Sequence, residues 1–277
     1  MKTEYIHEQG VGRLNEDAIS LNDTIFGVFD GATSLNAKKY KNGITGGAMA
    51  SEITRKIFER NNDSLKNFAQ KANSAIYDEM IKNNVDTSDK TSLWSTSAAV
   101  VQLNDDSLEW MQIGDSLILI IYNDGSFKVA VTDYDHDSET LNMWKKISHK
   151  TDKQIFQVMG NQIKKVRKMM NVDYGVLNGE TEFDSFIKSG KENLENISHV
   201  LLFTDGLFIP SENPSEKHDF QRFVELFHKG GLKEIRDYVR KIEQSDPDCK
   251  QYPRFKKHDD IAAIAIDFKD IAVSCAA

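Results

Sequence analysis

The chain has 277 residues, of which 39% are hydrophobic and 28% charged, and its formal net charge at pH 7 is -8. A chain of this length can bury a substantial core, as one large domain or two small ones. The acidic balance, without a basic stripe, argues against nucleic-acid and anionic-membrane binding. No apolar stretch approaches the roughly 20 residues of a membrane span, and the N-terminus lacks a signal-peptide apolar region, so we expect a cytoplasmic protein.

The first half of the chain predicts strands, then two helices, then more strands. Short strands near residues 4–8 and 18–21 precede an apolar run at 25–29. Apolar residues at helical spacing then predict a pair of packed helices. The helices are expected at Gly46–Arg60 and Leu65–Ile81. The four strands that follow, expected at Ser97–Leu103, Leu108–Ile113, Leu117–Tyr122 and Phe127–Val131, predict an antiparallel meander.

The second half repeats this alternation. A polar stretch with weaker helical signals, which includes a helical pattern at Gln154–Met170, leads to an apolar strand from Val200. Two helices, at Asp219–His228 and Leu232–Glu243, precede a final strand at Ile261–Phe268. Strands, helix pair, strands, helix pair and strand are typical of an α+β domain whose helices cover its sheets. With no repeat and no Pro- or Gly-rich linker, we expect residues 1–277 to form a single domain.

Aspartates stand at the ends of three buried strands. Asp30 and Asp205 each follow an apolar run and precede a glycine, and Asp259 lies just before the last strand. A rigid sheet holds such carboxylates at the edge of the core, which suggests a shared metal site. Asp124 is the internal control, because it lies in a tight Asn-Asp-Gly hairpin turn between two strands and is interpreted as a turn residue only.

The cysteines and the isolated basic run suggest no other class of site. Cys249 and Cys275 lie far apart without CxxC spacing, so neither a disulfide framework nor a zinc cluster is indicated. The run Lys164-Lys165-Val-Arg167-Lys168 is interpreted as a solvated helix face rather than a nucleic-acid site.

Eight short motifs, in order and spread over residues 10 to 268, resemble those of the PPM family, the metal-dependent Ser/Thr protein phosphatases also called type 2C. The small bacterial members are the most similar. The motifs are Arg13-Leu-Asn15-Glu16-Asp17-Ala18, Val28-Phe-Asp30-Gly31-Ala-Thr-Ser34, Gly46-Gly47-Ala48, Ser95-Thr96-Ser97-Ala98, Ile113-Gly114-Asp115-Ser116, Thr132-Asp-Tyr-Asp135-His136, Leu202-Phe-Thr-Asp205-Gly206-Leu207 and Asp259-Asp260-Ile261. The resemblance implies a central antiparallel β-sandwich flanked by pairs of α-helices.

The resemblance also implies the roles of the strand-end aspartates. Asp30 is expected to bridge two metal ions, and the backbone carbonyl of Gly31 to bind one of them. Asp205 and Asp259 are expected to complete the shell of the other ion. Asp260 is then a neighbour of the site and not a ligand.

The remaining acidic residues and one cation are assigned in the same way. Glu16 and Asp17 are expected to act mainly through metal-bound waters, and Asp115 together with Asp205 resembles a third, weaker metal site. Arg13 is expected to bind the substrate phosphate, although it stands three residues before Glu16 where many family members have a spacing of four.

These residues suit one reaction on chemical grounds. A carboxylate-rich, all-oxygen shell favours hard ions such as Mn²⁺ or Mg²⁺ over zinc. Two ions about 4 Å apart can share a water and lower its pKa towards neutrality, so that no protein nucleophile is needed. The expected activity is hydrolysis of phosphoserine and phosphothreonine in proteins. Ala32 occupies the place of a His found in many family members, so a metal-bound water or the solvent has to protonate the leaving group.

Two questions stay open at the level of sequence. The alternatives to a phosphoprotein phosphatase are an inactive metal-binding regulatory module and a metal-dependent hydrolase of small phosphoesters. Residues 137–178 correspond to a mobile flap subdomain beside the family's active site, but a plain surface insertion also fits their polarity.

Overall fold

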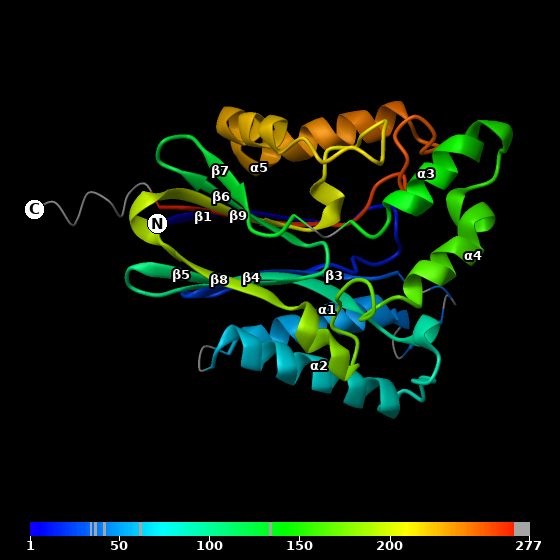
Figure 1. The fold of residues 1–277 in the computed structure, drawn as a ribbon, viewed down its shortest axis with the longest axis horizontal. Coiled ribbons are helices and arrows are strands. Elements are labelled where there is room, and N and C mark those ends of the chain that lie inside the picture. The colour runs from blue at the N-terminus through cyan, green and yellow to red at the C-terminus, as the bar shows by residue number, and fades with distance from the viewer. Residues whose placement is uncertain (34, 36–37, 41–42, 61–62, 133–134, 269–277) are drawn as a thin grey trace, which may run out of the picture.

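The fold is a four-layered arrangement in which two antiparallel sheets lie face to face between helices (Figure 1). The computed structural model describes all residues except 34, 36–37, 41–42, 61–62, 133–134 and 269–277. Ser34, Asp133, Tyr134 and Cys275, which the sequence analysis named, therefore lie outside the described residues. The α+β class and the helix-covered sandwich are confirmed.

Each sheet has five strands, and every pairing within it is antiparallel. The first sheet has the order β1-β10-β9-β6-β7. Its strands are β1 (Lys2–Glu8), β10 (Ile261–Asp267), β9 (Ile197–Phe203), β6 (Leu117–Tyr122) and β7 (Phe127–Val129). The second sheet has the order β2-β3-β4-β5-β8. Its strands are β2 (Ala18–Leu21), β3 (Ile25–Gly31), β4 (Thr96–Leu103), β5 (Ser107–Ile113) and β8 (Lys188–Asn193).

The central strands are apolar on both faces because both faces are covered. In β10, Ala263 packs towards the helical layer, whereas Ile264 packs between the two sheets. Since side chains alternate along a strand, such a run fills two cores at once. This double burial holds the ends of the central strands firmly in place.

The helices form the two outer layers and one end of the molecule (Figure 1). They are α1 (Gly46–Phe58), α2 (Leu65–Lys82), α3 (Ser138–Ile147), α4 (Ile155–Arg167) and α5 (Phe220–Ser245). The pair α1 and α2 covers the second sheet, and α5 covers the first. The two helices predicted in this region are both found within α5. They are separated by a kink at Gly230 and Gly231, where the backbone is not helical and Gly231 has a φ of 69°.

The predicted meander is wrong at its centre. The strands β4 and β5 pair with each other, and β6 pairs with β7, but the two pairs belong to different sheets. The turn at Gly114 and Asp115 carries the chain from one sheet across to the other. Local alternation shows where strands lie, but it does not show which sheet each joins. The edge strand β8 was not predicted, because its polar residues lack a buried face.

The helices α3 and α4 lie beside one end of the sandwich (Figure 1). Their small apolar cluster contains Trp144, Ile155, Met159 and Ile163. The helical pattern predicted at Gln154–Met170 is confirmed in α4. In the described part of the chain, no helix combines the length and the apolar character that crossing a membrane requires.

Candidate active site

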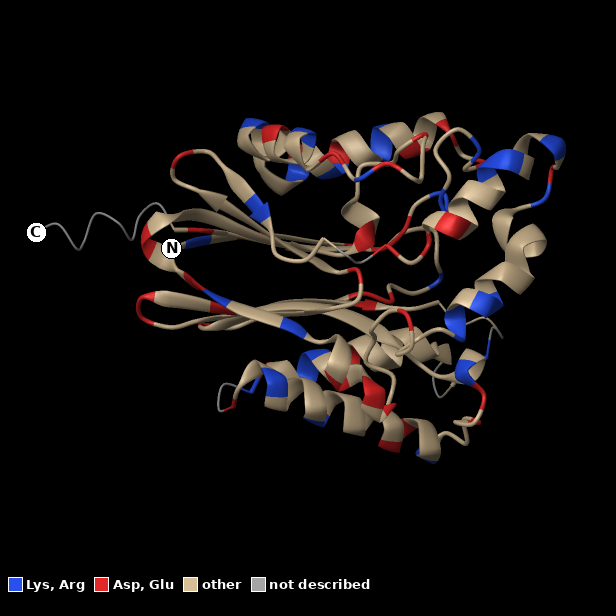
Figure 2. Ribbon diagram, viewed as in Figure 1, with Lys and Arg blue, Asp and Glu red and all other residues tan. Residues whose placement is uncertain are grey.

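Acidic residues gather where the strand ends of both sheets face α3 and α4 (Figure 2). Asp30, Asp115, Asp205 and Asp259 all line one cavity there. They come from four chain segments that are far apart in sequence. The two sheets therefore bring together the strand-end aspartates that the sequence singled out, whereas Asp124 lies in the exposed β6–β7 turn and accepts a hydrogen bond from the Ser126 amide at 2.9 Å.

Asp30 projects from the end of β3, where the backbone is closely packed. Asp30 and Gly31 are paired with Ser97 and Thr96 of β4. A Cβ atom on Gly31 would lie 2.4 Å from the carbonyl oxygen of Gly47 and 2.5 Å from that of Glu16. No side chain fits at this position, so the glycine lets three segments meet directly behind the Asp30 carboxylate.

Asp205 and Asp259 approach from the other sheet. Asp205 begins a short 3-10 turn after β9, and Asp259 lies just before β10. The two loops are in direct contact, since a Cβ atom on Gly206 would lie 1.8 Å from the carbonyl oxygen of Asp260. Asp259 accepts a hydrogen bond from the Lys256 ammonium at 2.6 Å.

Glu16 and Asp17 are buried and are held by threonine hydroxyls. The Glu16 carboxylate accepts hydrogen bonds from Thr33 at 2.7 Å and Thr45 at 2.6 Å. Thr204 donates to Asp17 at 2.7 Å. The sequence did not assign these threonines to the site. Thr204 directly precedes one Asp-Gly motif, and Thr33 lies two residues after the other. Their hydroxyls hold the two carboxylates behind the residues that line the cavity.

Asp260 has a structural environment. Its two carboxylate oxygens accept hydrogen bonds from the backbone amides of Gly10 at 2.7 Å and Glu16 at 2.8 Å. The side chain is only 4% exposed. Both of its oxygens thus connect the segment before β10 to the segment before β2, and Asp259 is the member of the pair that faces the cavity.

Burial and mutual repulsion change the acidity of the clustered carboxyls. Burial, followed by the charges of neighbouring aspartates, raises the pKa of Asp30 well above its ordinary value. Burial also raises the pKa of Asp17, and a hydrogen bond from Thr204 opposes this. Burial, together with the charges of Asp259 and Asp115, raises the pKa of Asp205 to about 8, although a side-chain hydrogen bond with Asp30 acts in the opposite direction. Such a set of oxygen donors, too close to remain ionised together, fits a hard divalent cation.

These shifts predict the pH dependence of stability without metal. A carboxyl with a raised folded-state pKa binds its proton more tightly in the folded chain, so stability falls as the pH rises from about 4 through the folded-state pKa. We expect the melting temperature of the chelator-treated protein to fall between pH 5 and 8.5, and to fall less in Asp205→Asn. Carboxylates with lowered pKa, such as Asp63 at about 2, titrate below this window. Equal slopes in both proteins, measured by circular dichroism, would contradict this expectation.

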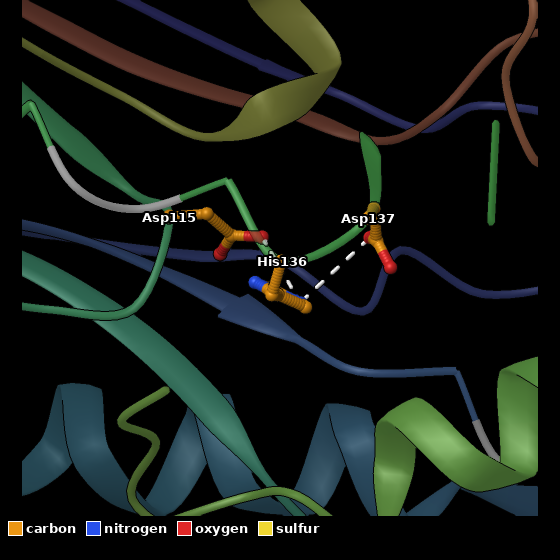
Figure 3. Close-up of side chains that lie close together, drawn as sticks. All are labelled: Asp115, His136 and Asp137. Carbon is orange, nitrogen blue, oxygen red and sulfur yellow. Dashed lines mark ion pairs between the residues drawn. The ribbon is translucent and has the colours of Figure 1, made fainter. Parts of the chain in front are cut away.

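Asp115 has a second set of neighbours (Figure 3). Asp115, His136 and Asp137 present ligand atoms within 4.8 Å of one another, which is close enough to hold a metal ion. The His136 Nε2 atom lies 3.9 Å from Asp115 and 3.7 Å from Asp137, and its ring stacks on Tyr174 at 3.8 Å. From the sequence, Asp115 was paired with Asp205, and neither His136 nor Asp137 was assigned to the site, although His136 lies in the motif at 132–136 and Asp137 directly follows it.

The cations that line the cavity do not include Arg13. Arg13 is exposed and lines neither the cavity around Asp30 nor the adjoining one that extends over Phe208. Lys256 lines both cavities. Arg167, at the end of α4, lines the first and donates to Ser95 and to the Thr33 carbonyl, both at 3.3 Å. Neither Lys256 nor Arg167 was expected at the site from the sequence.

The chain matches the family model described as Protein phosphatase 2C over residues 7–241. No curated protein matches it in sequence.

Several solved structures share the fold. The serine/threonine phosphatase Stp1 from Staphylococcus aureus is 16% identical, with a TM-score of 0.58 over 96% of this chain and 94% of that one. The catalytic domain of the serine threonine protein phosphatase PstP, in complex with two manganese ions, is 14% identical, with a TM-score of 0.56 over 96% and 97%. RsbX in complex with magnesium is 12% identical, with a TM-score of 0.52 over 95% and 92%.

Proposed function

The chain belongs to the protein phosphatase 2C family of metal-dependent phosphoprotein phosphatases, and we propose that its strand-end carboxylates are the metal-binding active site. The observation that carries this proposal is the convergence of Asp30, Asp205 and Asp259 on one cavity. In this assignment Asp30 would be shared by two ions, and Gly31 would contribute its carbonyl. Glu16 and Asp17 would act through metal-bound waters, and Asp115 would belong to a third, weaker site.

The donor set selects the type of ion. All the assigned ligands offer oxygen atoms, which suits Mn²⁺ or Mg²⁺, the ions present in the PstP and RsbX structures. Bound ions would supply a water of lowered pKa and positive charge for the phosphoryl oxygens. The chain's own contribution is to hold the carboxylates rigidly, which strands β3, β9 and β10 do through double burial.

The substrate is a phosphoserine or phosphothreonine side chain on another protein, and the enzyme acts in the cytoplasm. A nucleic-acid or membrane partner is not expected, given the net charge of -8. Ala32 leaves no side-chain acid at that position, so the proton for the departing alkoxide would have to come from a metal-bound water or the solvent. Residues 137–178, which border the cavity through Asp137 and Arg167, form the flap subdomain in this proposal.

The experiment that tests this function compares substrates and metals. We expect the protein to hydrolyse p-nitrophenyl phosphate and a phosphothreonine peptide with Mn²⁺, and to lose this activity in EDTA. Turnover in EDTA would contradict metal dependence. Two other results would favour the remaining alternatives: metal binding without turnover indicates a regulatory module, and rapid hydrolysis of small phosphoesters with an untouched peptide indicates a small-molecule hydrolase.

A further inference from the structure

A cation in the active-site cavity would help to bind the substrate phosphate, a role expected of Arg13 from the sequence. A phosphate monoester carries negative charge into a cavity that Asp30, Asp115, Asp205 and Asp259 line. Bound ions would offset part of this repulsion, and a positively charged donor in the cavity would stabilise the phosphoryl oxygens further. Arg13 is exposed and lines neither cavity, whereas other cations do line them.

Among the described residues, three cations line the two cavities, and they differ in which groups they donate hydrogen bonds to. Arg254 is committed to the fold, because it donates to Asp246 and to the backbone carbonyls of Glu243, Tyr252 and Lys257. Arg167 lines only the cavity around Asp30 and donates to Ser95 and the Thr33 carbonyl. Lys256 lines both cavities, and its ammonium donates to Asp259 at 2.6 Å.

The Lys256 ammonium has donors to spare. An ammonium carries three N–H groups, and the contact with Asp259 uses one of them. Its side chain is 20% exposed, so it opens to the cavity while its stem is packed. We propose that Lys256 is a catalytic residue that binds the phosphoryl group of the substrate, in the role that the sequence analysis gave to Arg13. This inference rests on the proposed function of the same site.

The segment that carries Lys256 is fixed by several contacts. Arg254 holds its loop through the bonds described above, one of which goes to the Lys257 carbonyl. The ring of Phe255 packs on Phe156 of α4, with centroids 5.8 Å apart. Trp144 of α3 donates to the Cys249 carbonyl at 2.7 Å. A residue held in this way loses little freedom on binding phosphate, as a preorganised catalytic group should.

The chain provides a matched control in the next residue. Lys257 has the same charge but is exposed, and it lies outside both cavities. The substitutions Lys256→Met and Lys257→Met both remove one positive charge and keep an unbranched stem. Lys256→Arg retains the charge. Circular dichroism and melting temperature establish that each variant is folded.

The test measures phosphate and metal binding separately. For Lys256→Met we expect the KM for p-nitrophenyl phosphate and the inhibition constant of inorganic phosphate to rise about tenfold or more, with partial recovery in Lys256→Arg. Direct calorimetric binding of inorganic phosphate to the Mn²⁺-loaded protein should weaken in parallel, and Mn²⁺ affinity should not fall. Lys257→Met is expected to match the wild type in every measurement.

Two results would overturn the inference while leaving the proposed function intact. One is a Lys256→Met variant whose phosphate affinity equals that of Lys257→Met in an active enzyme. The other is tighter Mn²⁺ binding with unchanged phosphate affinity, which would make Lys256 a counter-ion of Asp259 alone. Failure of the proposed function itself is distinct, since the wild type would then show no Mn²⁺-dependent turnover.

Discussion

Asp30→Asn is expected to lower the rate of p-nitrophenyl phosphate hydrolysis by roughly a hundredfold to a thousandfold at saturating substrate. The substitution keeps the size of the side chain but removes the charge assigned to bridge two ions. It also removes a source of repulsion, since burial and neighbouring carboxylates raise the pKa of Asp30. The folded state should therefore be at least as stable as the wild type in EDTA, so the loss is one of catalysis and not of folding.

Asp124→Asn is the control for this variant. Asp124 also precedes a glycine at a strand end, but it lies exposed in the β6–β7 turn. Its activity should stay within about twofold of the wild type, because surface substitutions away from special features have small effects. Comparable losses in both variants would mean that the effect of Asp30→Asn comes from general damage to Asp-Gly turns.

The adjacent pair Asp259 and Asp260 should separate metal binding from stability. Asp260→Ala leaves the backbone amides of Gly10 and Glu16 without their acceptor, which costs about 1–3 kcal/mol for the buried Glu16 amide and less for the half-buried Gly10 amide. Asp259→Ala removes an assigned metal ligand whose side-chain partners are Lys256 and the amide of Asp260. We expect a large fall in melting temperature for the first variant, and weaker Mn²⁺ binding with little loss of stability for the second.

Thermal melting in EDTA and calorimetric Mn²⁺ titration of both variants check this separation. The assignment is reversed if Asp259→Ala melts at much lower temperature while Asp260→Ala stays stable and binds metal poorly. Equal losses of stability would mean that both carboxylates support the fold.

The sequence predicts most of the helices and strands of this fold, but not edge strand β8 and not how the strands pair. Apolar runs such as Val200 to Phe203 identify buried strands because double burial leaves a continuous hydrophobic stretch. The predicted meander is wrong at Gly114, because the apolar pattern of β5 and β6 is the same whether these strands pair with each other or belong to opposite sheets. The polar edge strand β8 gave no signal, because it is defined by its backbone pairing with β5.

The candidate site was likewise predicted only in part. The strand-end aspartates were identified because a buried strand fixes the position of the residue that follows it. His136, Asp137 and Lys256 were not expected there, because their loops are placed by tertiary contacts such as the stacking of His136 on Tyr174. The role of Asp260 was inferred only from the family pattern, whereas its two amide contacts join segments about 250 residues apart.

Calorimetric titration of the metal-free protein with Mn²⁺, in parallel for the wild type, Asp30→Asn and Asp124→Asn, is the most direct test that the strand-end aspartates form the metal site. The account predicts that the wild type and Asp124→Asn bind at least two ions with the same affinity, and that Asp30→Asn loses at least one of them. An Asp30→Asn protein that binds as many ions as the wild type, equally tightly, would contradict it.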